Sequence, residues 1–481
     1  MPLNRHSLVA LIVTCLLAAP IFGVASTDSN QPPNVIIFLT DDQGYADLGI
    51  YGSDDLDTPN IDQLAKDGIR FTSFYAQPLC GPSRAALLTG RYPARINEPG
   101  GAKNPNTILA ANEVTIAEIL QQAGYETALI GKWHLAGDGA AWDYAPPPLP
   151  PGRPGGKGPF EPALMPNAQG FDLFFGTPMH NGYTQQVDPR RFIVDLMRNE
   201  QVVDSQTDVN LLTARYTEEA RQFIRSNARK PFFLLLSHNM PHVSLGVSER
   251  FSGKSSRGLY GDVIMELDWS VGEILGELRS LAIEDNTLFI YLSDNGPPLG
   301  QLTDRNGASS LPLRGGKYST WEGGVRVPAI MRWENTIPSQ QEEHGIASVM
   351  DIFPTIAAAT KATIPKDLEL DGQNLLPRAI GEPMSSDRTY FYHSLTSLQA
   401  VRSGPWKLVL PRSKDTPELS WLGRYTDDVS EYQLYNLEND IGETINVAKD
   451  FPDVVSKLIH ETEQAAKQGL SSVPHATTRH P

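Results

Sequence analysis

Four short apolar runs, each followed at once by ionisable or amide residues, constrain the fold of this chain most strongly. They are VIIFL (35–39), TALI (127–130), FFLLL (232–236) and LFIYL (288–292). Runs this short and this apolar are typical of strands that are buried on both faces. Because amphipathic stretches alternate with them, we expect an α/β fold. Its large, mixed and mainly parallel sheet is sandwiched by helices.

The polar residues that follow these runs predict a single crevice. In chain order they include Asp41 and Asp42, Lys132 and His134, His242, and Asp294 and Asn295. Neighbouring parallel strands end at the same edge of a sheet, and open α/β sheets bind their ligands at that edge. We therefore expect these side chains to converge.

Two of these pairs predict a metal site. Asp41 with Asp42 and Asp294 with Asn295 offer carboxylate and amide oxygens, which suit a hard cation such as Ca²⁺. The alternative is that adjacent polar residues after a strand belong only to turns or helix caps. The occurrence of two such pairs favours the metal.

The stretch PLCGPSRAALLTGR (78–91) predicts a helix that Gly90 ends, with Cys80 at its N-terminus. Backbone N–H groups at a helix N-terminus attract anions, and Arg84 can share the face of Cys80. Lys317, in the glycine-rich stretch RGGKYSTWEGGVRVP, is a further candidate for binding an anion. Taken alone, Cys80 could equally be a buried small hydrophobe, and each Lys or His a solvated or core side chain.

The N-terminal residues predict a secretory signal peptide over 1–26. Arg5 precedes an apolar run over 8–25 that small residues close. We therefore expect a secreted or periplasmic protein without a membrane span. Removal of the leader would remove Cys15, so Cys80 would have no disulfide partner. A net charge of −16 argues against nucleic acid as a partner.

Organisation along the rest of the chain predicts two further parts. A long helix is expected over 259–281, and the Pro- and Gly-rich stretch 146–166 is expected to be a loop on the rim of the crevice. After about Tyr390 a hairpin (400–409), a strand (433–435) and a terminal helix (451–469) are expected. We therefore divide the chain into the signal peptide, a catalytic α/β domain over 27–389 and a C-terminal antiparallel sheet with a helix over 390–481.

Several of these stretches together resemble one family. CGPSR (80–84), continued by LTGR (88–91), is similar to the signature C-x-P-S-R followed by L-T-G-R of the type I sulfatases. These are the formylglycine-dependent, arylsulfatase-like members of the alkaline phosphatase superfamily. The stretches around Asp41, Lys132, His242, Asp294 and Lys317 follow in the family's order, as do AVRSGPWKLV and LYNLENDIGET. The resemblance covers nearly the whole mature chain.

The resemblance implies a mechanism. Cys80 would be converted to formylglycine by a formylglycine-generating enzyme, and its hydrated aldehyde would attack sulfur. Ca²⁺ would be held by Asp41, Asp42, Asp294, Asn295 and the residue at position 80. Arg84, Lys132 and Lys317 would bind the sulfate oxygens. His242, together with Lys317, would protonate the leaving alcohol, and His134 would then take a proton from the second hydroxyl at position 80. His180 is carried over only as a substrate contact.

The implied substrate is a sulfated carbohydrate: an algal galactan such as carrageenan, or a glycosaminoglycan. One alternative is a phosphomonoester or phosphonate hydrolase of the same superfamily. Another is an inactive glycan-binding protein, which would keep an unmodified thiol at position 80. Ser244 stands where relatives often have proline, which is a departure from the family pattern.

Overall fold

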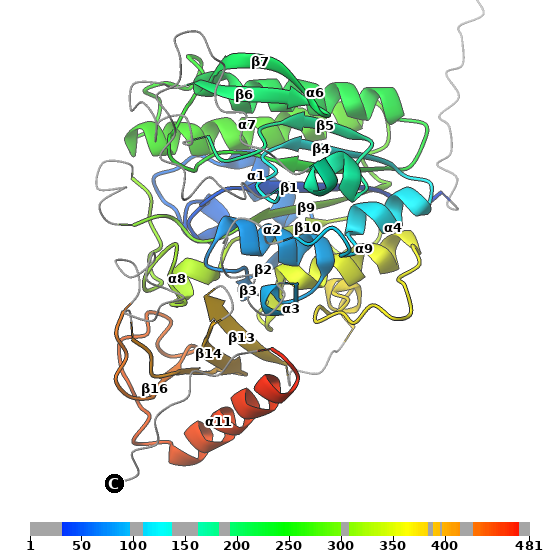
Figure 1. The fold of residues 1–481 in the computed structure, drawn as a ribbon. Helices are drawn as coiled ribbons and strands as arrows, with labels where there is room; N and C mark the ends of the chain where they lie inside the picture. The colour runs from blue at the N-terminus through cyan, green and yellow to red at the C-terminus, as the bar shows by residue number, and fades with distance from the viewer. Residues whose placement is uncertain are drawn as a thin grey trace, which may run out of the picture. The chain divides into compact units, whose positions relative to one another are not determined.

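The centre of the molecule is a mixed sheet of ten strands (Figure 1). The computed structural model describes residues 31–96, 109–136, 162–181, 193–299, 307–382, 388–394, 397–413 and 427–470. In spatial order the strands are β11 (Gln341–Glu343), β2 (Ile69–Phe71), β10 (Ala329–Arg332), β9 (Thr287–Ser293), β1 (Asn34–Thr40), β8 (Phe232–Ser237), β4 (Glu126–Gly131), β5 (Leu173–Gly176), β6 (Ile193–Arg198) and β7 (Gln201–Asp208).

The four apolar runs form adjoining parallel strands, as predicted. The order β9-β1-β8-β4 is parallel throughout, and β5 extends it. Thr40 at the end of β1 pairs with Ser293 of β9, and Gly131 of β4 pairs with Ser237 of β8. The four strands therefore end at one level, which brings the polar residues after them to one edge of the sheet.

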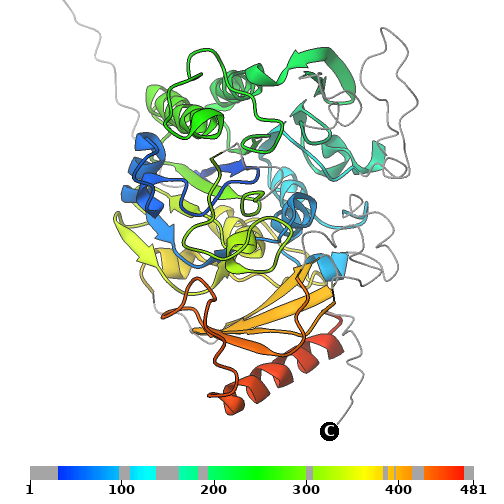
Figure 2. The ribbon, with the colours of Figure 1, turned by 90° about the vertical axis from the view of Figure 1, so that its left-hand side faces the viewer.

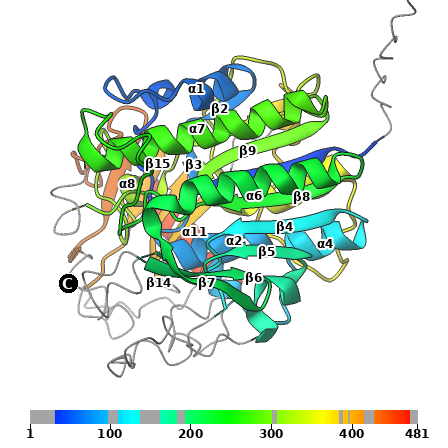
Figure 3. The same ribbon diagram turned by 90° about the horizontal axis from the view of Figure 1, so that it is seen from above.

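Helices cover both faces of this sheet because β1 alternates its side chains between two cores. Val35, Ile37 and Leu39 pack into one core with residues of α2 (Cys80–Thr89), α4 (Ile116–Gln122) and α9 (Ile352–Thr360). Ile36 and Phe38 pack into the other with α1 (Pro59–Lys66), α6 (Leu212–Asn227) and α7 (Gly258–Ser280), which Figure 3 shows lying over the sheet. Each fully buried side chain of this kind contributes roughly 1.5–3 kcal/mol.

Local signals place the helices where the sequence predicts them. Thr115 caps α4 in a capping box with Glu118, which satisfies donors at the start of the helix. Pro59 opens α1, and Gly90 ends α2 in the left-handed conformation with φ 69°. The long helix expected over 259–281 is α7.

The remaining elements of the main part are short. They are η1 (Gly49–Tyr51), β3 (Phe74–Tyr75), α3 (Pro93–Ile96), η3 (Pro162–Leu164), η4 (Pro166–Gln169), η5 (Val209–Leu211), α8 (Glu322–Val325), β12 (Ala347–Ser348), η6 (Val349–Asp351) and α10 (Leu376–Ala379). Residues 146–161 of the loop predicted over 146–166 lie outside the described residues. Its end departs from the prediction, because Pro162 and Pro166 each open a turn of 3₁₀ helix.

A second, antiparallel sheet follows near the C-terminus, as expected. Its order is β13 (Thr389–Ser394), β14 (Ser397–Ser403), β15 (Trp406–Val409) and β16 (Gln433–Asn436). Leu458 of α11 (Pro452–Lys467) packs on Val401, Leu408 and Leu434 of this sheet, and Figure 2 shows the helix running beside it.

The described residues from Pro32 onward belong to one compact unit. Tyr390 and Tyr392 of β13 pack into the core that also holds α2. The division at residue 390 therefore stays an interpretation of the sequence, and the predicted signal peptide lies outside the described residues. None of the described helices combines the length and the apolar character needed to cross a bilayer.

Candidate active site

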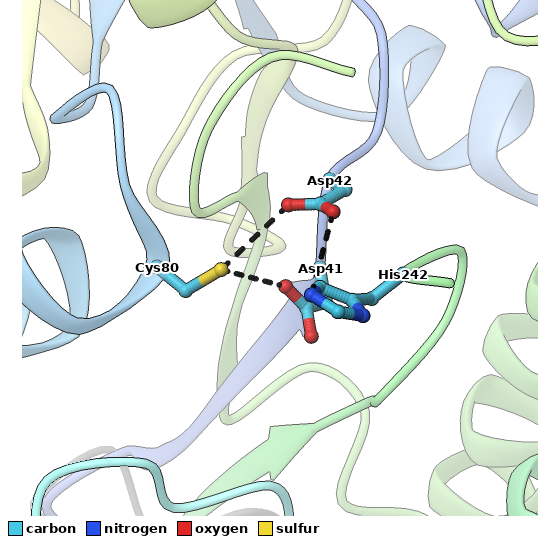
Figure 4. A group of neighbouring side chains, drawn as sticks. All are labelled: Asp41, Asp42, Cys80 and His242. Atoms are coloured by element: carbon cyan, nitrogen blue, oxygen red, sulfur yellow. Dashed lines mark hydrogen bonds and ion pairs between the residues drawn. The ribbon is translucent and has the colours of Figure 1, made fainter. Parts of the chain in front are cut away.

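The polar residues after the strands meet at the N-terminus of α2. Figure 4 shows Cys80 and His242 beside the carboxylates of Asp41 and Asp42, which follow β1 directly. Cys80 is the first residue of α2, because Leu79 before it has an extended backbone. The structure thus brings together segments that lie far apart in the sequence.

The thiol of Cys80 is surrounded by charge. Its Sγ lies 3.2 Å from Asp41 Oδ1, 3.6 Å from Asp42 Oδ1 and 3.2 Å from Lys317 Nζ. The residue is 3% exposed. Burial and the charge of Asp41 raise the pKa of the thiol well above its ordinary value. Since the thiolate is the nucleophilic form, Cys80 as encoded is a poor nucleophile.

Two lysines neutralise the two aspartates. Lys132 Nζ donates to Asp41 Oδ2 at 2.6 Å, and Lys317 Nζ lies 2.6 Å from Asp42 Oδ1. Burial alone would raise the pKa of Asp41, but the nearby positive groups, Lys132 foremost, together outweigh it, and the pKa lies well below its ordinary value. Burial raises the pKa of Asp42, although Lys317 opposes that shift. Asp42 and Cys80 raise the pKa of Lys317 despite its burial, so it remains an ammonium.

Arg84 is held by four hydrogen bonds. Its Nε and Nη2 donate to Asp294 Oδ2 at 3.0 and 2.8 Å. Its Nη1 donates to the Lys132 carbonyl at 3.0 Å and to Ser237 Oγ at 2.5 Å. A guanidinium fixed in this way is well suited to bind an oxyanion in one orientation.

Gly131 makes the turn into Lys132 possible. Its φ is 116°, and a Cβ there would lie 1.8 Å from the Ser237 carbonyl oxygen. Only glycine fits such a close approach of two strand ends. This residue therefore controls how Lys132 leaves β4.

The donor set is suitable for a metal ion. Ligand atoms of Asp41, Asp42, Cys80 and His242 all lie within 4.8 Å of one another. Asn295 donates its Nδ2 to Asp42 Oδ1 at 2.7 Å, and its buried Oδ1 has no hydrogen-bond partner among the described residues. A buried amide oxygen of this kind can serve as a ligand to a hard cation.

Asp294 is adjacent but lies outside that group of four. Its Oδ1 accepts the Asp42 backbone N–H at 3.1 Å, and its Oδ2 accepts from Arg84. Burial and Asp41 raise the pKa of Asp294. Among the predicted metal ligands, Asp41, Asp42 and Cys80 therefore face one another directly, whereas Asp294 is engaged by Arg84.

Three histidines line the same region. His242 Nε2 is 3.8 Å from Asp42 Oδ2, the rings of His180 and His242 are 5.1 Å apart, and those of His134 and His180 are 5.6 Å apart. Burial and, to a smaller extent, nearby lysines lower the pKa of each, to about 3 for His180. All three are therefore neutral imidazoles in the structure. Every predicted site residue is thus found in or beside one cluster.

Two supporting residues were not predicted. Ser237 accepts from Arg84 and donates to the Lys132 carbonyl at 2.7 Å. Asn181 donates to the His242 carbonyl at 3.0 Å. Ser237 could have been found, since it ends a predicted strand. Asn181 directly follows His180 but carries no sequence signal of its own.

The comparisons with known proteins agree with this geometry. The family model described as Sulfatase matches residues 33–362. The chain is 36% identical to the N-acetylgalactosamine-6-sulfatase of Canis lupus familiaris over 415 residues, covering 82% of this chain and 74% of the relative. It is 34% identical to the N-acetylgalactosamine-6-O-sulfatase of Bacteroides thetaiotaomicron over 489 residues, covering 89% and 92%.

One solved structure is similar over almost its whole length. It is the crystal structure of Ps i-CgsB in complex with k-i-k-neocarrahexaose. The TM-score is 0.73 at 30% identity, covering 93% of this chain and 96% of that one.

Proposed function

The chain belongs to the sulfatase family and is a sulfuric ester hydrolase, and from this premise we propose that it removes sulfate from a sulfated glycan by a formylglycine- and Ca²⁺-dependent mechanism. The observation that carries the mechanism is the position of Cys80. Its sulfur lies at a helix N-terminus, within 3.6 Å of two carboxylates and 3.2 Å of a lysine ammonium.

The names of the relatives support a glycan as the substrate. Two are sulfatases of N-acetylgalactosamine 6-sulfate, and the Ps i-CgsB structure holds a neocarrahexaose. The proposed substrates are accordingly a carrageenan-type galactan or a glycosaminoglycan. The substrate partner is a polyanion, so an acidic protein must bind it in a locally positive site. Arg84, Lys132 and Lys317 provide such a site.

The nucleophile is proposed to come from Cys80 after oxidation to formylglycine by a separate maturing enzyme. When present, the hydrated aldehyde supplies a hydroxyl that attacks sulfur and a second hydroxyl that allows the sulfate to leave. This proposal explains why a buried thiol with a raised pKa lies at the centre of the site.

A Ca²⁺ ion is proposed to be held by Asp41, Asp42, Asn295 and the residue at position 80, with Asp294 at its side. The unpartnered Asn295 Oδ1 supports this assignment. When bound, the ion polarises the nucleophilic oxygen and offsets the negative charge of the carboxylates. Calcium content of the purified protein, measured by elemental analysis, should be about one ion per chain. Asp42→Asn should lower it, at a cost in stability because Lys317 loses its buried partner.

The other side chains have roles that follow from their positions. Arg84, Lys132 and Lys317 neutralise negative charge on the sulfate oxygens. His242 donates a proton to the leaving alcohol, and His134 accepts one from the nucleophile's second hydroxyl. His242 is neutral in the structure because burial lowers its pKa. A sulfate ester bound beside it would raise that pKa, which the donor role requires.

Two measurements test the proposal. In a host that contains the maturing enzyme, the mass of the peptide with residue 80 should fall by the mass of H₂S minus that of one oxygen atom, because the side chain CH₂SH becomes CHO. A panel of defined sulfated oligosaccharides, read by mass, should identify the glycan. An unmodified thiol with full turnover would disprove the formylglycine mechanism.

Matched aryl sulfate and aryl phosphate esters test the alternative of a phosphoester hydrolase. The sulfate should be cleaved faster by at least about a hundredfold in kcat/KM, because we expect the site to bind the sulfuryl transition state of a monoanionic ester more tightly than the phosphoryl one. A faster phosphate reaction would favour the alternative.

Export of the protein is proposed from the apolar run over 8–25. Sequencing the N-terminus of the protein recovered from the periplasm or the medium should give a start near residue 27. Recovery only in the cytoplasm, with the leader intact, would overturn this proposal.

A further inference from the structure

We infer that Tyr318 is a substrate contact whose aromatic ring forms one wall of the subsite for the sugar that carries the sulfate. This inference rests on the proposed function, because it assumes that the sulfate is attached to a sugar. It assigns a specificity-determining role to a residue that neither the motifs nor the metal site require.

The backbone of Tyr318 has a positive φ angle, as do two residues of the active site. Its φ is 75°, a left-handed value that bulky residues rarely adopt. Nine described residues other than glycine have positive φ, and two of the others are the site residues Asp42 and His134, with φ 71° and 63°. Strained backbone tends to occur at functional sites, where the surrounding structure holds it in place.

A backbone hydrogen bond connects Tyr318 to the segment that carries Cys80 and so stabilises this conformation. The Tyr318 N–H donates to the Pro78 carbonyl at 2.9 Å, and the Lys317 N–H donates to the Pro297 carbonyl at 2.8 Å. Pro78 lies two residues before Cys80. The left-handed turn therefore fixes the Lys317–Tyr318 pair relative to position 80.

The ring lies at the distance expected for a sugar wall. Its centroid is 5.6 Å from Lys317 Nζ, which is itself 3.2 Å from Cys80 Sγ, so the ring is at most about 9 Å from the sulfur. The charged groups are buried, whereas Tyr318 is only partly buried. Tyr318 is therefore partly accessible to solvent directly beside a buried lysine of the site.

The chemistry of the ring suits the part of the substrate that the charged groups do not bind. Lys132, Lys317 and Arg84 bind sulfate oxygens but offer nothing to the C–H face of a sugar. Ligand sites usually combine a few charged groups with apolar or aromatic walls that orient the rest of the ligand. A tyrosine supplies a large flat surface with few rotatable bonds.

The experiment uses the full-length, matured protein and two kinds of substrate. One is a sulfated sugar, N-acetylgalactosamine 6-sulfate or a sulfated neocarrahexaose. The other is 2,2,2-trifluoroethyl sulfate, an activated ester with no ring. Tyr318→Ala should raise KM for the sugar substrate about tenfold and leave kcat/KM for trifluoroethyl sulfate within about twofold. Tyr318→Phe should retain activity on both, since it keeps the aromatic face.

A glycine variant separates function from folding. Glycine relieves the left-handed strain, so Tyr318→Gly should keep or raise the thermal midpoint while it loses sugar affinity as Tyr318→Ala does. Gln340→Gly is the matched control: Gln340 has φ 59° in an exposed turn, and this change should leave both substrates unaffected.

Each other outcome overturns the inference. Equal losses on both substrates would mean that Tyr318 acts only through Lys317, and no loss on the sugar would remove it from the subsite. If the parent protein cleaves trifluoroethyl sulfate but neither sugar, both the proposed role of Tyr318 and the proposed glycan substrate are wrong. If the parent protein cleaves none of the three substrates, the proposed function itself is contradicted, and the inference about Tyr318 with it.

Discussion

At the scale of single residues, charge compensation is what allows so many ionisable groups to be buried together. Asp41, Asp42 and Asp294 face Lys132, Lys317 and Arg84 in close pairs. An unpaired buried charge lowers the free energy of unfolding by several kcal/mol. Removing one member of a pair should therefore destabilise the protein by leaving the other charge unpaired. Substitutions that keep charge are therefore the more informative ones, and Cys80 and His242 can be changed without breaking a pair.

Cys80→Ala should abolish turnover, by at least about 10⁴-fold, because no other group in the site can replace the nucleophile. It should cost only about 1 kcal/mol of unfolding free energy, since a single sulfur atom is lost. Steady-state kinetics and urea denaturation measure the two effects. Cys80→Ser is the size-matched control and should be equally inactive. Loss of the fold in both variants would favour Cys80 as a packing residue only.

His242→Ala should slow esters with poor leaving groups by about 10²–10⁴-fold, because general-acid catalysis contributes that much. Esters with good leaving groups, such as 4-nitrophenyl sulfate, need little protonation and should slow less than about tenfold. The slope of log kcat/KM against leaving-group pKa measures this. His344→Ala, at an exposed histidine, is the control. An unchanged slope would remove His242 from the role of proton donor.

The residues of the site were predictable to the extent that they follow strand ends or lie in a family motif. Asp41, Lys132 and Asp294 satisfy both conditions, Cys80 lies in a family motif at the start of a helix, and the structure brings the four together. Tyr318 lies in the glycine-rich stretch that carries Lys317, but the resemblance gives it no role. The feature that points to Tyr318 is its positive φ angle. That angle is held by the hydrogen bond to Pro78 and cannot be read from residue types.

At the scale of elements, the C-terminal sheet supports the segment that carries Lys317. Lys407 of β15 is fully buried and donates to the Thr320 carbonyl at 2.8 Å and to Glu322 Oε1 at 3.0 Å. Its Nζ also lies 2.7 Å from Glu443 Oε1. The start of α8, five residues after Lys317, is thereby fixed from outside the large sheet.

Lys407→Met should lower the free energy of unfolding by about 3–5 kcal/mol, because it leaves two buried glutamates without their common partner. It should also lower kcat/KM by loosening Lys317. The combined change of Lys407→Met with Glu322→Gln and Glu443→Gln should recover part of the stability, as urea denaturation can show. Lys457→Met, at an exposed lysine on α11, is the matched control. A neutral Lys407→Met would contradict this account.

Within the large sheet, the sequence predicts the parallel strands better than the antiparallel ones. Strands buried on both faces are marked by unbroken apolar runs, as in β1, β8 and β9. β7 at the edge of the sheet reads QVVDSQTD and exposes most of its residues, so it lacks both a long apolar run and a clear alternation. β10 is only four residues long and follows the glycine-rich stretch that carries Lys317.

At the scale of the whole molecule, buried neutral histidines make stability depend on pH. His393 of β13 lies 2.6 Å, through Nε2, from the Leu470 carbonyl and so connects the C-terminal sheet to the residues after α11. Burial lowers its pKa to about 4 from the model-compound value of 6.5. A proton therefore binds the unfolded chain more tightly than the folded one.

The stability from this residue is complete above pH 6.5 and is lost as the pH falls toward 4. Between pH 7 and pH 5 it should account for about 2 kcal/mol. His393→Gln should make the difference in unfolding free energy between these pH values smaller by that amount. His460→Gln, at an exposed histidine, should not. Parallel pH profiles for His393→Gln and the parent would contradict the assignment.

The burial of position 80 also sets an order of events during biosynthesis. With 3% of Cys80 exposed beneath strand ends drawn from four distant segments, a second protein cannot reach the thiol once the sheet has closed. An enzyme that oxidises this residue must act on the nascent, still extended polypeptide. Under the proposed formylglycine mechanism, the yield of active protein then depends on whether modification precedes folding, because the thiol of a folded chain is buried.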